Sequence, residues 1–365
     1  MKYLFLLFVL GWNAAAAQNV GLGNKELKLL RDWVRSPNPD SSLQRLYAAQ
    51  RRVADKALLE VPHPIDTIRS EGLLQGDPKK TATQEALKDM AKMYALALVY
   101  KVSGDSAYER QLAKYLTAWA GADHPRGDPI DDTNLDPAIE AFDMVKGELL
   151  PDERKAVREW LRETASWEIS AVYNNPGRAT SSNNWHSHRL KEVGEIGFVI
   201  GDTSLEGYAV RGLKEQIGRN LLPDGSSEDF VTRDALHYHV YDLEPLLKLA
   251  IVVERAKRIN YYSYVAPSGS SIQKSVAWLM PFVTGEKTHA EFVNSTVEFD
   301  RRRAQNGEAA YKAGSLFEPK NGVMTLLLAG FWDATLLETA RKAAGTDALY
   351  PAWQSVVNAL IRAAG

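Results

Sequence analysis

Helical periodicity dominates this chain, and the alternating pattern of β-strands is nearly absent. Apolar residues between positions 81 and 103 recur at the spacing of one helix face, and the next such segment begins almost at once, near Ser106. A connection this short joins two neighbouring helices into an antiparallel hairpin. Further segments with the same periodicity cover about 24–35, 137–148, 151–172, 187–200, 206–219, 241–257, 271–283 and 333–344.

This succession of helices predicts an all-α fold, because it contains no βαβ alternation and no repeat of fixed length. Two architectures suit it: an (α/α) toroid, which is an incomplete helical barrel of antiparallel helix hairpins, and a curved solenoid. Both present a concave groove lined by loops. We expect a toroid that forms a single domain over residues 18–365, with the stretch from about 260 onward as the one part that could be a semi-independent lobe.

The N-terminus has the pattern of an export signal. Lys2 supplies a positive start, an apolar run follows, and three alanines precede Gln18. The sequence therefore predicts a signal peptide over residues 1–17 and a periplasmic or secreted protein. The apolar run is too short to span a bilayer, and no later stretch approaches twenty apolar residues, so we expect no membrane partner.

Composition narrows the chemistry further. The chain has no cysteine, which excludes disulfides, thiolate nucleophiles and cysteine metal ligands. Its formal net charge is only −2, so it lacks the positive surface that nucleic-acid binding requires. If the ligand is anionic, the positive charges that bind it must be local.

Four of the seven histidines stand in two His-x-His pairs, His186 and His188 in "NNWHSHR" and His237 and His239 in "RDALHYHVYDLEPL". Such a pair binds metal well on a strand, but on a helix residues two apart diverge by about 200°. The flanks here are helical, so we expect no metal and no cofactor. A metal site with one histidine from each pair plus an aspartate, and a role in packing or capping alone, stay open as alternatives.

The second motif also contains Arg233, Tyr238 and Tyr241, which suits metal-free proton transfer. Tyrosine titrates near pH 10 in water, so a phenolate that acts near neutral pH needs a cation beside it. In the first motif, Asn183 and Asn184 can donate amide hydrogens to a carboxylate or oxyanion, and either histidine can move a proton.

One reaction that needs this set is β-elimination in a uronate polysaccharide. The enzyme must remove the proton on C5, next to the carboxylate, and protonate the glycosidic oxygen that leaves C4. The carboxylate must be neutralised so that the enolate can form. Asparagine, arginine and histidine suit the neutralisation, and tyrosine and histidine suit the proton transfers.

The two motifs, in this order and about fifty residues apart, resemble the paired signatures of the alginate lyase family. These helical-toroid polysaccharide lyases include poly(mannuronate) lyases and glucuronan lyases. The segments 62–77 and 267–292 are also similar to that family. The resemblance implies metal-independent β-elimination of a β-linked uronate polymer, either alginate (mannuronan) or glucuronan.

The resemblance also implies roles for single residues. It makes Tyr238 the proton donor and often the base, with Asn183 or Asn184 and an arginine neutralising the uronate. Mannuronate lyases have the pattern Asn-Asn-His, whereas Trp185 stands in the third position here.

The histidine's role therefore falls to His188, which shares a helix face with Asn184, or to His186. The arginine is displaced as well, because Arg233 lies two residues later than in the family pattern. These shifts favour a relative that acts on a uronate other than mannuronate, with glucuronan as the leading candidate.

Further substrate contacts are expected from Asn183, Trp185, Arg189, His237, His239, Tyr241, His63 and Arg69. The run Arg301 to Arg303 is interpreted as a solvated charged face. Two other functions remain: a metal-dependent hydrolase that uses the His-x-His pairs, and a glycan-binding protein without catalysis.

Overall fold

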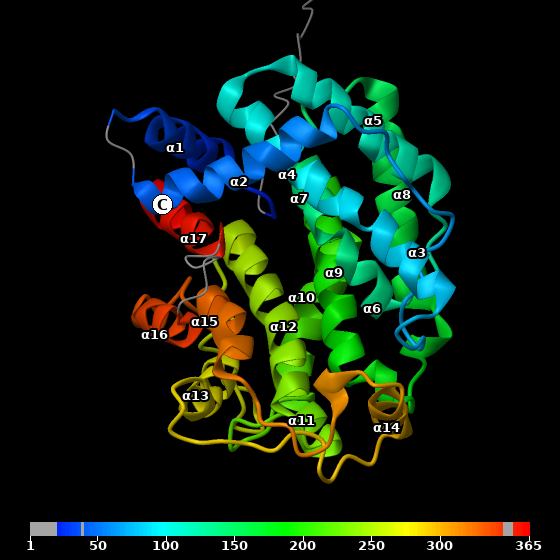
Figure 1. The fold of residues 1–365 in the computed structure, drawn as a ribbon, viewed down its shortest axis with the longest axis vertical. Helices are drawn as coiled ribbons and strands as arrows, with labels where there is room; N and C mark the ends of the chain where they lie inside the picture. Colours follow the sequence, from blue (N-terminus) through cyan, green and yellow to red (C-terminus); the bar gives the residue numbers. More distant parts are fainter. Residues whose placement is uncertain (1–19, 38–39, 346–352) are drawn as a thin grey trace, which may run out of the picture.

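A computed structural model describes residues 20–37, 40–345 and 353–365, so the predicted signal peptide lies outside the described residues. Helices packed around one another make up the molecule (Figure 1). Within the described ranges no strand occurs, and β-pairing is limited to two isolated bridges. The prediction of an all-α toroid is confirmed.

The first half of the chain forms helix hairpins around the upper part of the view in Figure 1. Its helices are α1 (Asn24–Arg35), α2 (Ser41–Ala57), α3 (Pro78–Ala86), α4 (Lys88–Ser103), α5 (Ser106–Ala122), α6 (Pro129–Asp132), α7 (Asp136–Val145) and α8 (Pro151–Ser170), with short 3₁₀ turns η1 (Thr133–Leu135), η2 (Val172–Asn174) and η3 (Ala179–Ser181).

The second half supplies the central helices and the lower rim. Its helices are α9 (Asn184–Ile200), α10 (Thr203–Arg219), α11 (Glu228–Arg233), α12 (Leu236–Lys257), α13 (Ile272–Val283), α14 (Glu298–Gln305), α15 (Val323–Ala329), α16 (Thr335–Ala344) and α17 (Trp353–Ala364), with the 3₁₀ turns η4 (Ala309–Tyr311) and η5 (Pro319–Gly322). Its last helix, α17, packs beside α1 at the upper left of Figure 1.

Most helix boundaries follow local capping. Asp105 accepts a hydrogen bond from the backbone of the first turn of α5, and Asp202 does the same for α10. Gly104 and Gly201 end α4 and α9 in the left-handed conformation, where a side chain would be strained. These boundaries lie close to the predicted ones because their signals are adjacent in sequence.

Several elements differ from the prediction. The segment 81–103 is two helices, α3 and α4, separated at Leu87. Helices α9 and α12 begin at Asn184 and Leu236, a few residues earlier than predicted, so both His-x-His pairs lie in first helical turns. The sequence did not predict α2 and α17, or the short helices α6, α11, α14 and α15.

Two groups of buried apolar side chains form the core. One lies among α1 to α5, α7, α8 and α17, and the other lies among α10, α12, α13, α15 and α16. Helix α9 joins them, because Val193 and Ile196 pack in the first group and Leu190 and Phe198 in the second. In the described part of the chain, no helix combines the length and apolarity needed to cross a membrane.

An irregular stretch after α13, the closing segment (residues 284–318), runs along the lower rim and carries α14 (Figure 1). It reaches the loop that precedes α3: the backbone N–H of Gln75 donates to Glu308 at 2.9 Å, and the amide of Asn306 donates to the Gln75 carbonyl at 3.0 Å. Residues far apart in sequence thus meet beside the first turn of α12.

Candidate active site

Tyr238 occupies the first turn of α12, beneath the closing segment. Its hydroxyl accepts a hydrogen bond from Arg303 Nη1 at 3.1 Å and donates to Asp300 Oδ1 at 3.3 Å. The Arg233 guanidinium lies over its ring, 4.1 Å from the centroid, and binds the same aspartate at 2.6 Å. The side chain is 5% exposed, so the phenol is held in a nearly closed polar environment rather than in hydrocarbon.

The closing segment also fixes the start of α12. Ala235 provides no capping side chain; instead Glu291 accepts hydrogen bonds from the backbone N–H groups of Leu236 and His237, at 2.8 and 3.0 Å. Next to this cap, Asp234 and Phe292 both adopt positive φ, and the Phe292 N–H donates to the Asp234 carbonyl at 2.7 Å. Tyr238 is therefore positioned by residues more than fifty positions away.

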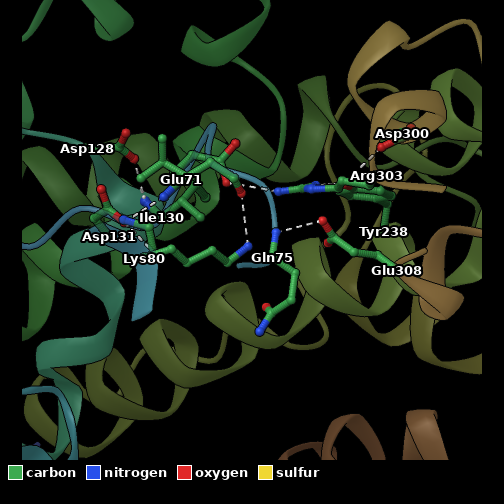
Figure 2. A network of polar contacts seen from close by, with 12 residues as sticks. Glu71, Gln75, Lys80, Asp128, Ile130, Asp131, Tyr238, Asp300, Arg303 and Glu308 are labelled. Atoms are coloured by element: carbon green, nitrogen blue, oxygen red, sulfur yellow. Dashed lines mark hydrogen bonds and ion pairs between the residues drawn. The ribbon is translucent and has the colours of Figure 1, made fainter. Parts of the chain in front are cut away.

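Burial raises the pKa of Tyr238 well above its ordinary value, and the neighbouring Arg233 opposes that rise. The phenol is therefore protonated at neutral pH and can act as a proton donor. Arg303 extends the site, because its Nη2 binds Glu71 Oε2 at 3.3 Å. Figure 2 shows this guanidinium between Tyr238 and Glu71.

A small cavity lies beyond Glu71 and is lined by Arg69, Glu71, Arg126, Asp128, Asp131 and Tyr173. Asp131 shapes it by accepting hydrogen bonds from the backbone of Ser70 and Glu71 (Figure 2). The exposed Arg69 and Arg126 guanidinium groups make no hydrogen bond or ion pair within the described residues. Two unpaired cations thus face this cavity, together with Glu71, Asp128 and Asp131, and Glu71 connects the cavity to Arg303.

Asp128 supplies this cavity with a neutral hydrogen-bond donor. Its Oδ1 accepts from the backbone N–H of Ile130 at 3.1 Å and caps α6. Burial, followed by the charge of Asp131, raises the pKa of Asp128 to about 8. A carboxyl group that stays protonated near neutral pH can donate a hydrogen bond to a bound carboxylate.

His188, the preferred histidine from the sequence, lies between α9 and α12 with both ring nitrogens engaged. Nδ1 lies 2.9 Å from the Thr133 hydroxyl, and Nε2 lies 3.1 Å from the Tyr241 carbonyl. Because a carbonyl only accepts, Nε2 carries the hydrogen and Nδ1 accepts from Thr133. Burial lowers its pKa to about 3, and its ring packs 4.4 Å from that of Tyr241. His188 therefore positions Tyr241. A role for His188 in proton transfer stays a prediction.

His186 points away from His188, toward α10, as the divergence of residues two apart on a helix requires. Its Nδ1 accepts a hydrogen bond from Arg189 Nη1 at 3.1 Å. Arg189 itself is fully buried, with Nε donating to the Glu168 carbonyl at 3.0 Å. The structure therefore places the predicted contact residue Arg189 inside the protein, because its charge is compensated by the buried carboxylate of Glu168 at 3.7 Å.

The two histidines of the second pair, His237 and His239, also face different surroundings. His239 is fully buried, where Nδ1 contacts the Ser227 hydroxyl at 3.0 Å and the ring packs against Trp278, so it is not placed to contact a substrate. His237 is half-buried instead, with its ring 5.2 Å from that of Tyr238 and 6.3 Å from that of Tyr241. Burial lowers the pKa of His237, so its imidazole is neutral.

The asparagines before α9 have capping and packing roles. Asn183 caps the helix by accepting from the backbone N–H of Trp185 at 3.1 Å. Asn184 is 1% exposed and donates its backbone N–H and its amide to the buried Asp229. A role for Asn184 in neutralising a uronate stays a prediction, since its amide would have to leave Asp229. Trp185 is half-buried, 5.1 Å from the ring of Tyr173 at the cavity.

Two other residues complete the comparison with the prediction. Arg69 lies in the cavity beside Tyr173, but the exposed His63 lines a different surface hollow with Leu59 and Val61. The sequence interpretation missed Arg303, Asp300, Glu71, Arg126 and Asp128. Of these, only Asp300 and Arg303 could have been found from the sequence. They are three positions apart, so on a helix they share one face and can reach the same partner.

One cluster of acidic groups has the spacing of metal ligands. Oxygens of Asp136, Glu192 and Glu195 lie within 4.8 Å of one another, deep in the core. Asp136 is already bound by the ammonium groups of Lys191 and Lys248. Burial raises the pKa values of Glu192 and Glu195. The cluster is therefore best explained as a buried network of two lysines and partly protonated carboxyl groups.

Comparisons with known proteins agree with this architecture. An alginate lyase from Bacteroides ovatus superposes with a TM-score of 0.66 at 17% identity, over 91% of this chain and 97% of that one. Alginate lyase A1-III from Sphingomonas species A1 has a TM-score of 0.61 at 20% identity, over 87% and 89%. Its tyrosine-to-phenylalanine variant complexed with tetrasaccharide gives 0.58 at 22%, over 74% and 79%.

The comparison with curated proteins gave no match. The family model for alginate lyases matches residues 26–289, which is well over half of the chain and includes both motifs and Tyr238. This chain therefore belongs to the alginate lyase family and is a polysaccharide lyase.

Proposed function

We propose that the protein cleaves a β-linked uronate polymer by metal-independent β-elimination at a catalytic groove beside Tyr238. The observation that carries this proposal is the hydrogen-bonded set of Arg303, Tyr238 and Asp300 next to the cavity with two unpaired arginines. A protonated phenol and local positive charge are the groups that this elimination needs.

Arg69 and Arg126 bind the carboxylates of the bound chain. Both guanidinium groups lack a protein partner within the described residues, so a substrate carboxylate would satisfy them without breaking an ion pair. Asp128 adds a neutral donor in the same cavity. This arrangement masks the negative charge of the sugar, which lowers the cost of forming the enolate.

The proton transfers fall to the two adjacent residues at the start of α12. The neutral imidazole of His237 accepts the C5 proton, and the electron pair of the broken C5–H bond forms the C4=C5 double bond as the C4–O bond breaks. Tyr238 delivers its phenolic proton to the leaving glycosidic oxygen. Arg303 and Arg233 then stabilise the phenolate that remains, because both are already in contact with Tyr238.

Glucuronan is the proposed substrate rather than mannuronan. Trp185 stands where mannuronate lyases have a histidine, and the structure places His188 against Thr133 and Tyr241. The N-terminal pattern of residues 1–17 supports export to the periplasm or the medium.

A substrate panel tests this proposal. Purified mature protein is incubated with mannuronan, guluronan, glucuronan and hyaluronan, and the unsaturated product is followed by its ultraviolet absorbance. We expect product from glucuronan that persists after treatment with a chelator. No unsaturated product from any of these polymers would contradict the lyase assignment, and loss of activity on chelation would contradict metal independence.

A further inference from the structure

The two histidines of "NNWHSHR" face two different spaces. His188 points toward α12, whereas His186 lines a second pocket between α9, α10 and the segment 174–181. Arg189 is buried on the inner side of His186 and hydrogen-bonded to it. The second pocket, which we call the His186 pocket, is therefore separated from Tyr238 by the body of α9.

The floor of the His186 pocket is tightly built, and the Leu190 side chain below it is fully buried. Helices α9 and α10 approach so closely there that a Cβ on Gly212 would lie 2.2 Å from Leu190 Cδ2. Only glycine fits this contact without a shift of Leu190.

The walls of the pocket are rich in hydrogen-bond donors. Because Arg189 donates to Nδ1 of His186, the neutral imidazole carries its hydrogen on Nε2. The Tyr208 hydroxyl accepts a hydrogen bond from the Asn174 amide at 3.3 Å, which leaves its own hydrogen available.

The charged side chains that line the His186 pocket favour the binding of an anion. The exposed Arg211 and Arg219 line it and make no hydrogen bond or ion pair within the described ranges. Glu215 is the single carboxylate among the described residues that line it, so the cations exceed the anions.

We propose that the His186 pocket binds the carboxylate of a uronate-bearing saccharide, as an accessory site outside the catalytic groove. Arg211 and Arg219 hold the carboxylate, and the sugar ring lies over Gly212, within reach of His186 and Tyr208. The choice of a uronate, rather than another small oxyanion, rests on the proposed function. Such a site keeps a long polymer attached while the groove acts on another part of it.

Calorimetric titration of mature protein with D-glucuronate tests this site. We expect the double variant R211Q/R219Q to bind glucuronate roughly tenfold more weakly, because it loses charge-assisted hydrogen bonds. The matched control is Lys214→Gln, an exposed cation on the same helix that does not line the pocket and should bind as wild type does. Equal affinity of the double variant and wild type would overturn the proposal.

Two further measurements test which ligand the His186 pocket binds and whether the pocket helps to hold long chains. Inorganic phosphate that binds as tightly as glucuronate would show a general oxyanion site and overturn the saccharide assignment. With polyuronate as substrate, we expect the double variant to raise KM for long chains more than for short oligosaccharides; an equal effect on both would contradict the accessory role. Failure of wild type to release unsaturated product would contradict the proposed function and leave the glucuronate titration valid.

Discussion

The Arg303 guanidinium donates a hydrogen bond to the Tyr238 hydroxyl at 3.1 Å, across 65 positions of sequence, while its other terminal nitrogen binds Glu71. This contact joins three separate segments: the first turn of α12, the closing segment and the loop before α3. It places a permanent cation where the phenolate forms when Tyr238 gives up its proton.

Replacing that cation should slow catalysis more than it weakens binding. We expect Arg303→Gln to lower kcat by roughly 10²-fold, a size found for the loss of one stabilising donor at an active site. The control is Arg302→Gln, an exposed arginine next to it in α14. Steady-state kinetics on the cleaved polyuronate measure both. An unchanged kcat in Arg303→Gln would exclude a role in stabilising the phenolate.

Asp128 should impose an alkaline limit on substrate binding. Its pKa is raised to about 8, so the carboxyl group is a neutral donor below that pH and a carboxylate that repels the uronate above it. We expect kcat/KM of wild type to fall as pH rises through about 8. Asp128→Asn, which stays neutral and still caps α6, should lack this decline. The pH profiles of the two proteins decide the question; a decline of the same size in both would place its origin elsewhere.

Glu291 should stabilise α12 from outside the helix. Its two carboxylate oxygens accept from Leu236 and His237, and glutamine has only one oxygen. We expect Glu291→Gln to lower the free energy of unfolding by about 1 kcal/mol and Glu291→Ala by about 2 kcal/mol, as for other helix caps. Urea denaturation gives these values. If both variants unfold like wild type, the cap has no energetic role.

Glu244 should make stability depend on pH. Burial raises its pKa from 4.5 to about 7, so its contribution to stability is complete below about pH 4.5 and is lost as pH rises through about 7. At about 1.4 kcal/mol per pKa unit, this loss is at most about 3.5 kcal/mol.

The matched variant is Glu244→Gln, which keeps an acceptor for the Thr325 hydroxyl at 3.2 Å and does not ionise. Its free energy of unfolding should fall less than that of wild type between mildly acidic and mildly alkaline pH. Parallel falls in the two proteins would show that Glu244 does not cause the pH dependence.

The sequence predicts the helices well where their signals are local. Asp105 and Gly104 stand directly beside the helix ends that they determine, and these ends were found. The start of α12 was placed too late, because its cap is Glu291, which is more than fifty residues away. Local periodicity contains no information about such a partner.

The candidate site could be predicted only in part, because some of its residues are neighbours in sequence and others are distant. The motif around Tyr238 identified the phenol and Arg233, which are neighbours in sequence. Arg303 was missed because it ends a run of three arginines, and Arg301 and Arg302 are indeed exposed. Only the turn of α14 brings Arg303 inward beside Asp300. Sequence also could not decide between His186 and His188, since their partners on α10, η1 and α12 are set by tertiary packing.

The most direct test of the account is the turnover of glucuronan by Tyr238→Phe, followed through the ultraviolet absorbance of the unsaturated product. The substitution removes only the hydroxyl, and Arg303 keeps Glu71 as a partner, so the fold should remain intact by circular dichroism. The account predicts that kcat falls on the order of 10²-fold or more while the polymer is still bound. A folded variant that releases unsaturated product at the wild-type rate would contradict it.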